Sequence, residues 1–134
     1  MSDPIHYLNP PLLARPNGFS HLTEATVDRM VFISGQVAYA PDGAIVGAGD
    51  LAAQTRQVFL NLSHALAAAN AGFDSVVKLN FFVRDISEAA VATIRQVRKE
   101  FLVETALPAS TMVGVAGLAK EALLLEVEAY ALKG

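Results

Sequence analysis

The sequence of 134 residues contains no cysteine, and this absence excludes several kinds of chemistry. Disulfides, a thiolate nucleophile and cysteine-rich zinc sites all require that residue. The three histidines, His6, His21 and His64, lie far apart and show no paired-ligand spacing. The chain also lacks a glycine-rich phosphate loop and a Ser-His-Asp set. We therefore expect no bound metal and no cofactor.

Long apolar runs and extended basic stretches are also lacking. No run approaches the roughly 20 apolar residues that span a bilayer, and the opening "MSDPIHYLNPP" has no signal-peptide pattern. A formal net charge of −3 disfavours attraction to a phosphate backbone or an anionic membrane. The small group Arg95, Arg98 and Lys99 lies off the apolar face of a predicted helix and is interpreted as solvated surface. We expect a cytoplasmic protein that binds neither nucleic acid nor membranes.

Apolar residues, by contrast, are abundant. They make up 53% of the chain, and only 17% of its residues are charged. Because one domain of this length has little interior, the surplus is expected at contacts between subunits. The sequence thus predicts a single domain over residues 1–134 that forms an oligomer of identical chains. Residues 1–18, which include the irregular stretch "NPPLLARPNG", are expected to form an N-terminal arm.

Helical and alternating apolar patterns predict an α+β domain. From Asp50 to Gly72 the apolar positions recur at intervals of four and three, which predicts a helix with Asp50 as its N-cap and Gly72 as its stop. Ser87 is the predicted N-cap of a second helix. Strands are expected at residues 19–25, 30–39, 76–85, 110–116 and 122–132, with a short additional strand near Ile45 as an open alternative. These elements predict two layers, with both helices on one face of a single mixed sheet.

Alternation along the predicted strands divides their side chains between the two faces of the sheet. One face is apolar and should pack against the helices: Val31, Ile33, Val37, Val77, Leu79, Phe81, Val83, Val113, Val115, Leu123, Leu125 and Val127. The other face is mixed: Phe32, Ser34, Gln36, Lys78, Asn80, Phe82, Ser110, Met112, Glu126, Glu128 and Tyr130. A mixed face either meets solvent or is buried against other subunits, with clefts where polar groups converge. Glu126 and Glu128 are accordingly either a solvated pair or acid/base carboxylates in a cleft.

Four blocks of the sequence, in this order, resemble one known family. They are "VFISGQVA" followed by "PDG", "QTRQVFLNLSHALAAANAGF" followed by "VVKLNFFVRD", "LPASTMVGVAGL", and "LLLEVEAYA". Together they cover nearly the whole chain from about Phe19, and they resemble the RidA/YjgF family, also labelled L-PSP or reactive intermediate deaminase. The resemblance implies a chorismate-mutase-like α+β fold and a homotrimer with three ligand clefts between neighbouring subunits.

The resemblance also implies site residues, and here the chain departs from the family. Ser34 and Gly35 match the family's Ser-Gly element, and Glu126 matches the C-terminal glutamate that is associated with the attacking water. Phe19 stands where the family has a tyrosine. Family deaminases read Pro-Ala-Arg where this chain reads Pro-Ala-Ser at residues 108–110, so Ser110 replaces the arginine that clamps the substrate carboxylate. The predicted site has Glu126 as its catalytic residue; its predicted substrate-binding residues are Phe19, Ser34, Gly35, Ser110, Thr111 and Met112.

The missing arginine bears on the function that the resemblance implies. Loss of even one charge-assisted hydrogen bond, worth roughly 1.5–3 kcal/mol, lowers affinity about 10- to 150-fold. Arg15 in the arm is a candidate replacement cation. The resemblance thus implies an imine or enamine hydrolase with altered substrate preference, not a standard 2-iminobutanoate deaminase. The alternative is a non-catalytic trimer that senses or carries a small metabolite. An endoribonuclease, an old family label, is the least favoured because the chain is acidic.

Overall fold

Both helices begin where the sequence predicts. The structure, a computed structural model that describes residues 4–133, places α1 at Leu51–Ala68 and α2 at Glu88–Arg98. The side chains of Asp50 and Ser87 each accept a hydrogen bond from the backbone N–H three residues later, at 3.1 Å and 3.0 Å. Each bond satisfies one of the N–H groups that the first turn of a helix leaves free. The two predicted N-caps are therefore confirmed.

The end of α1 comes earlier than predicted. Asn70 adopts a left-handed conformation, with φ of 56°, and the N–H of Ala71 donates to the carbonyl of Leu66 at 2.9 Å. This arrangement closes the last turn of a helix, and asparagine tolerates it better than most residues do. The stop at Gly72 is therefore wrong, and the chain turns at Asn70 into a single 3-10 turn, η1 (Phe73–Ser75).

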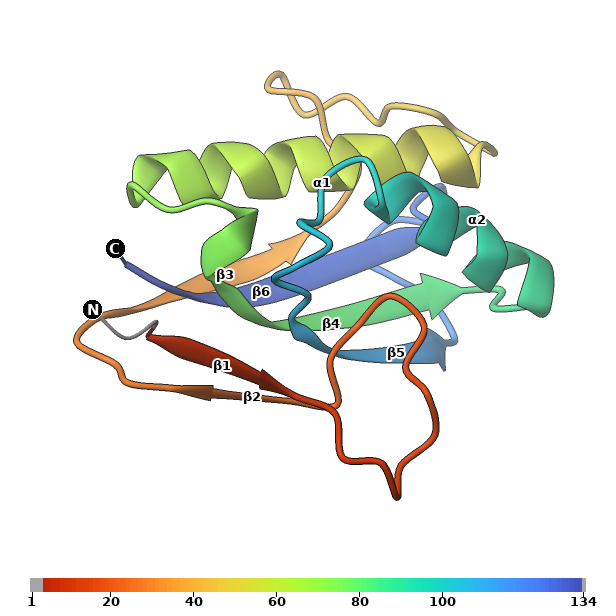
Figure 1. The fold of residues 1–134 in the computed structure, drawn as a ribbon. Coiled ribbons are helices and arrows are strands. Elements are labelled where there is room, and N and C mark those ends of the chain that lie inside the picture. The colour runs from red at the N-terminus through yellow and green to blue at the C-terminus, as the bar shows by residue number, and fades with distance from the viewer. Residues whose placement is uncertain (1–3, 134) are drawn as a thin grey trace.

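The main sheet has four strands in the order β3 (Met30–Gln36), β6 (Leu125–Leu132), β4 (Val76–Arg84) and β5 (Ala109–Val115). β6 pairs antiparallel with both β3 and β4, whereas β5 runs parallel to β4. Parallel neighbours need a crossover, and α2 supplies it between β4 and β5. Figure 1 shows both helices lying over one face of this sheet, so the predicted two-layer α+β architecture with a mixed sheet is confirmed.

The N-terminal segment differs from the prediction. No strand was expected within the arm of residues 1–18, but Ile5–Leu8 form β1, which pairs antiparallel with β2 (Leu22–Ala25) in a separate two-stranded sheet. The strand expected from Phe19 therefore begins at Leu22. β1 was missed because it is only four residues long and its partner lies beyond a long connection. Residues 1–3 of the predicted arm and residue 134 lie outside the described residues.

Two other strands are shorter than predicted, and the side chain of Gln54 accounts for the start of β6. This buried amide donates to the carbonyl of Ala122 at 2.8 Å and accepts from the N–H of Leu124 at 2.8 Å. It thereby takes the place of a neighbouring strand, and β6 begins at Leu125 rather than at residue 122. β3 ends at Gln36 instead of residue 39, and the proposed strand near Ile45 is an isolated bridge rather than a strand.

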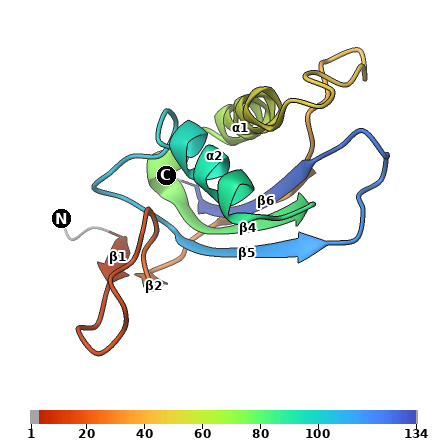
Figure 2. The same ribbon diagram turned by 90° about the vertical axis from the view of Figure 1, so that its right-hand side faces the viewer.

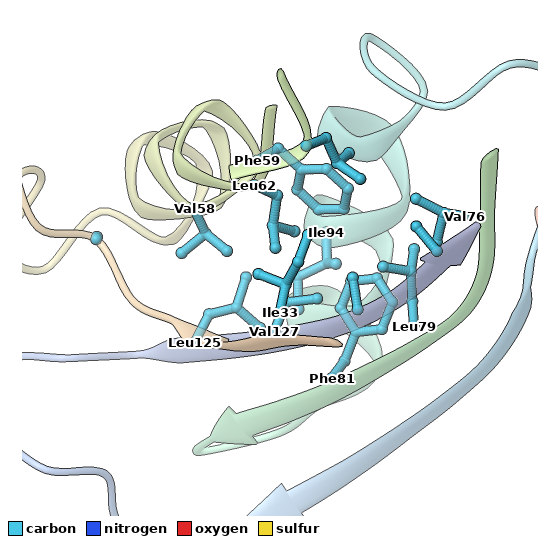
Figure 3. Close-up of a cluster of buried hydrophobic side chains, with 14 of the residues drawn as sticks. Ile33, Val58, Phe59, Leu62, Val76, Leu79, Phe81, Ile94, Leu125 and Val127 are labelled. Carbon is cyan, nitrogen blue, oxygen red and sulfur yellow. The ribbon is translucent and has the colours of Figure 1, made fainter. Parts of the chain in front are cut away.

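The core lies between the helices and the sheet. Phe59 stacks on Phe101 and also contacts Phe73 and Phe81, with ring centroids 5.4 to 6.1 Å apart. The rings sit among aliphatic side chains from both helices and three strands, and Figure 3 labels Ile33, Val58, Leu62, Val76, Leu79, Ile94, Leu125 and Val127. The apolar face predicted from strand alternation is therefore confirmed for β6, for β3 as far as Ile33 and for most of β4.

The predicted division between the two faces is wrong at three places. A register shift between Ile33 and Gln36 pairs Gln36 with the core residue Val127, so Gln36 faces the helices, and Ala38, not Val37, belongs to the core cluster. A register shift between Val76 and Lys78 turns Val76 into the core, so Val77 faces the opposite side. In β5 the whole assignment is inverted, because Ser110 and Met112 stand in register with the core residues Leu79 and Phe81. Paired residues on neighbouring strands share a face. Val113 and Val115, predicted to be core residues, therefore point away from the helices, and Val113 is 41% exposed.

Candidate functional site

The sheet face turned away from the helices is only partly covered. Figure 2 shows the helices on one side of the sheet and the β1–β2 hairpin on the other. Ile5 of the hairpin packs on Val77 and Leu132, and the Thr23 hydroxyl donates to the Val77 carbonyl at 2.8 Å. The uncovered part of this face, called here the open face, includes Phe32, Thr111 and Glu126. Phe32 is 71% exposed. An apolar ring this exposed suits a surface that meets another protein chain.

Glu126 lies on the open face, directly beside the backbone of Ser34 and Gly35. At this point β3 contains one extra residue relative to β6, so Ser34 and Gly35 form a bulge. A Cβ atom added at Gly35 would lie 2.7 Å from Cδ of Glu126, so only glycine permits this close approach. Within residues 4–133 the Glu126 carboxylate has no hydrogen-bond or ion-pair partner. An unpaired carboxylate that reaches solvent can accept a proton or hold a water molecule.

The neighbouring Glu128, in contrast, accepts two hydrogen bonds through one of its oxygens. Its Oε2 accepts a hydrogen bond from Asn80 Nδ2 at 2.9 Å and another from the Tyr130 hydroxyl at 3.1 Å. The hydrogen bond to Glu128, and next the charge of that carboxylate, raise the pKa of the Tyr130 hydroxyl. Alternation already placed Asn80 and Tyr130 on the mixed face, but no motif in the sequence marked them as partners of Glu128. Of the two glutamates, Glu126 is the one without a hydrogen-bond partner among residues 4–133.

Ser110 and Met112 lie on the other face of the sheet from Glu126. Their register with Leu79 and Phe81 turns them toward the helix side, at the edge strand β5. The expectation that Ser110 shares the mixed face with Glu126 is therefore wrong. Phe19 is brought near Ser110 instead, because the adjacent Ser20 bridges to Ala109 and its N–H donates to the carbonyl of Pro108 at 3.0 Å. Within one subunit, Phe19 therefore lies with Ser110 and Met112 on one face of the sheet. Ser34, Gly35 and Glu126 lie together on the other face.

Thr111 falls on the open face, since it alternates with Ser110 along β5. Its hydroxyl accepts a hydrogen bond from Lys78 Nζ at 2.8 Å. A hydroxyl held by an ammonium group beside the open face is a polar contact available to a ligand. Thr111 therefore belongs with the Glu126 side of the sheet and not with Ser110. Arg15, the candidate replacement cation, is exposed in the connection between β1 and β2.

A cavity of about 340 Å³ lies between the β1–β2 connection and α2, and sequence reasoning missed it. Arg98 reaches into it, although the sequence had been interpreted as placing this residue on the solvated surface. Its side chain is buried, with only 4% of the residue exposed, because the connection folds back over it. A larger cavity of about 630 Å³ lies beside the hairpin and is lined by Ile5, Asp74 and Thr105 among others. None of the predicted site residues lines either cavity.

Two further kinds of site are missing from residues 4–133. No group of three or more metal-ligating side chains comes together there. Neither helix of the described chain combines the length and the apolar character needed to cross a bilayer. The candidate site thus has two parts in one chain. A free carboxylate lies against a bulge on one face of the sheet, and small polar and aromatic residues lie on the other face.

Comparison with known proteins adds four findings. The family model described as Endoribonuclease L-PSP matches residues 13–133. The human protein named 2-iminobutanoate/2-iminopropanoate deaminase is 32% identical over 108 residues, which are 81% of this chain and 76% of that protein. The mitochondrial protein MMF1 of Saccharomyces cerevisiae is 35% identical over 79% of this chain and 70% of its own. A crystal structure of YyfB from Yersinia pestis, described as a Rid-family protein of unknown function, superimposes with a TM-score of 0.89 at 36% identity. That match covers 97% of this chain and 99% of the other.

Proposed function

The chain belongs to the RidA/YjgF family, and from this premise we propose that it is a homotrimer that hydrolyses a small imine or enamine in clefts between its subunits. The observation that carries the proposal is the Glu126 carboxylate, which is unpaired and held against the Gly35 backbone. Family relatives named as deaminases act on 2-iminobutanoate and 2-iminopropanoate. The proposal for this chain is the same type of reaction on a different range of substrates.

The position of the predicted residues supports clefts made by two chains. Glu126 and Ser110 lie on opposite faces of one sheet, so they cannot line a single cleft within one subunit. A neighbouring copy that docks on the open face could bring its own β5 edge, with Phe19 and Ser110, opposite Glu126 of the first copy. The exposed Phe32 ring on that face favours such a contact.

Glu126 acts in this proposal as the general base. Water adds to the imine carbon while one of its protons passes to the Glu126 carboxylate and the imine nitrogen takes a proton from solvent. The nitrogen of the resulting carbinolamine then takes the proton held by Glu126, the carbon–nitrogen bond breaks as the hydroxyl proton passes to solvent, and ammonia and a carbonyl product leave. Backbone groups at the Ser34–Gly35 bulge and the hydroxyls of Ser110 and Thr111 hold the rest of the substrate. Hydroxyl groups suit an uncharged polar group better than a carboxylate, because they bring no compensating charge.

A metabolite-binding trimer without catalysis is the second candidate. It is favoured by Ser110, which replaces the carboxylate clamp of the family deaminases, and by Phe19, which lacks the phenol of the family tyrosine. In that case Glu126 would recognise a ligand donor group and not activate water. An endoribonuclease, the activity in the family description, is least supported because the chain carries a net charge of −3.

The test compares two substrates and three variants. Freshly generated 2-iminobutanoate and an uncharged imine of the same chain length are mixed with the protein, and semicarbazone formation by the product carbonyl is followed. We expect acceleration with the uncharged imine, its loss in Glu126→Gln, and its retention in Glu121→Gln, a change at an exposed glutamate outside the strands. Ser110→Arg should raise kcat/KM for 2-iminobutanoate by about 10- to 150-fold. No acceleration with either substrate would favour the binding protein.

We also propose a cytoplasmic location for this protein. The location is open to test because one relative is named as mitochondrial. Cell fractionation followed by detection of the untagged protein is expected to recover it in the cytosolic fraction, and recovery in an organelle or membrane fraction would contradict the proposal.

A further inference from the structure

Arg98 is a buried cation in the last turn of α2, and its side chain is held from two sides. Nη2 of the guanidinium donates to the Asn17 carbonyl at 2.9 Å. The central carbon of the guanidinium lies 5.6 Å from the centre of the Phe81 ring, within the range of a cation–π contact. A guanidinium carries several N–H donors in a planar fork, and in residues 4–133 only the bond to Asn17 uses one of them. The other N–H groups of the Arg98 guanidinium are therefore available to a ligand.

The charge of Arg98 also lacks a counter-charge. No carboxylate of residues 4–133 lies within ion-pair distance of its guanidinium. Burial, and next the positive charge of Arg95, lower the pKa of Arg98 to about 10. A buried charge without an opposite partner is unfavourable, so an anion bound here would stabilise the protein.

The space beside Arg98 can hold such an anion. The cavity has a volume of about 340 Å³. It is lined by Asn17 and Gly18 from the β1–β2 connection, by Arg98 at the end of α2, and by Lys99, Leu102, Glu104 and Leu107 from the chain that follows α2. A Cβ atom at residue 18 would lie 2.7 Å from Nη2 of Arg98, and Gly18 has φ of +78°, so glycine is needed for the chain to pass this close. The guanidinium thus lines the cavity directly beside the backbone of Gly18, where no side chain covers it.

The remaining walls indicate what kind of anion fits. Leu102 and Leu107 provide apolar surface for a short hydrocarbon chain. Arg98 supplies a planar fork that matches a carboxylate, and Lys99 adds positive charge at the rim. Glu104, at the same rim, disfavours a dianion such as phosphate. The chemistry of the cavity is therefore that of a monoanion with an aliphatic tail.

We propose that the cavity between Asn17–Gly18, Arg98 and Leu107 binds a short aliphatic monocarboxylate through the Arg98 guanidinium. The site lies on the helix side of the sheet, whereas Glu126 lies on the open face, and it goes beyond the proposed hydrolysis. The ligand carboxylate accepts the guanidinium donors that are not bonded to Asn17, and its tail packs against Leu102 and Leu107. Occupancy ties the β1–β2 connection to α2.

The test is a titration followed by nuclear magnetic resonance, with butanoate as the probe and butanamide as its uncharged counterpart. We expect butanoate to shift the Arg98 Nε–H signal and the amide signals of Gly18 and Leu102, and butanamide to leave them in place. Arg98→Gln should weaken butanoate binding by about 10- to 150-fold. Arg98→Lys, which keeps the charge without the fork, should weaken it less. Arg56→Gln removes the same charge at an exposed site and should leave binding unchanged.

Three results would overturn the proposal. They are an Arg98 Nε–H signal that butanoate does not move, equal shifts with butanamide, and tighter binding of inorganic phosphate than of butanoate. The signal of the unmodified protein decides the first of these, so the test does not depend on the variants folding; their thermal melting is measured alongside. Glu126→Gln is expected to bind butanoate normally. A failed imine assay with an intact butanoate titration, or the reverse, therefore separates this site from the proposed hydrolysis.

Discussion

Replacing Gly35 with alanine tests whether the position of Glu126 matters. The added Cβ would lie 2.7 Å from Cδ and 2.8 Å from Cγ of Glu126, where ordinary contacts begin near 3.4 Å. The glutamate side chain must therefore move by about 0.7 Å or more at Cδ, and its carboxylate oxygens must swing away from the bulge. Because the obstacle is the end of a flexible side chain, the backbone can stay where it is.

The two expected effects of Gly35→Ala differ greatly in size. A displacement of about 1 Å at a reacting group lowers the rate by about 100-fold. The change in the free energy of unfolding should stay within about 1 kcal/mol. A new rotamer of Glu126 costs about 0.5–1.5 kcal/mol, and the lower entropy of the unfolded alanine chain offsets about 0.4–1 kcal/mol of that. The variant should thus be folded and nearly inactive.

The assay pairs semicarbazone formation from the uncharged imine with urea unfolding of the same sample. Gly117→Ala is the control, because a Cβ atom there meets nothing within 4 Å. It should leave the rate unchanged and raise the free energy of unfolding by no more than about 1 kcal/mol, through the lower entropy of the unfolded alanine chain. Full activity in Gly35→Ala would refute the argument that the bulge positions the Glu126 carboxylate. A large loss of stability would refute the claim that only the glutamate has to move.

Three further changes test other parts of the account. Phe32→Asp places a charge on the open face and should convert the oligomer to monomer in sedimentation velocity; an unchanged sedimentation coefficient would place the interface elsewhere. Gln54→Leu removes the side-chain partner of the Leu124 N–H and the Ala122 carbonyl, both in partly buried hydrogen bonds, and should lower the free energy of unfolding by about 1–3 kcal/mol, whereas Gln96→Leu at an exposed helical position should change it by less than about 0.5 kcal/mol. Arg56→Gln removes the exposed ion pair with Glu100, whose pKa is lowered first by the hydrogen bond from Arg56. Its small stability deficit should be present at neutral pH and vanish as the pH falls through that lowered pKa; a deficit that persists in acid would contradict the pairing.

Local rules in the sequence were enough for the helices and for much of the sheet. Asp50 and Ser87 cap the helices because a side-chain oxygen and an N–H three residues on are neighbours whatever the rest of the chain does. Alternation assigned the faces of β6, and of β3 as far as Ile33, correctly, since both segments bury one apolar row against the helices. The family resemblance added the position of Ser34, Gly35 and Glu126, and the structure brings these three together.

The predictions from the sequence were wrong where contacts with distant segments of the chain determine the environment of a residue. β5 carries small and mixed side chains, so its two faces look alike in the sequence, and the pairing of Ser110 with Leu79 fixes which face is which. Arg98 looks like surface on its own helix, and it is buried by the Asn17 carbonyl, 81 residues away along the chain. The bulge at Gly35 depends on the register of β3 against β6, which no local pattern specifies. These three errors concern contacts between segments that are far apart in sequence.

The most direct test of a cleft shared by two subunits is complementation between two inactive variants. Glu126→Gln removes the base, and Ser110→Trp blocks the opposite wall. Each variant alone should be inactive toward the uncharged imine. If one cleft takes Glu126 from one subunit and Ser110 from its neighbour, refolding the two variants together should restore activity, because some clefts then receive both intact residues. Mixed oligomers that form but stay inactive would contradict the account.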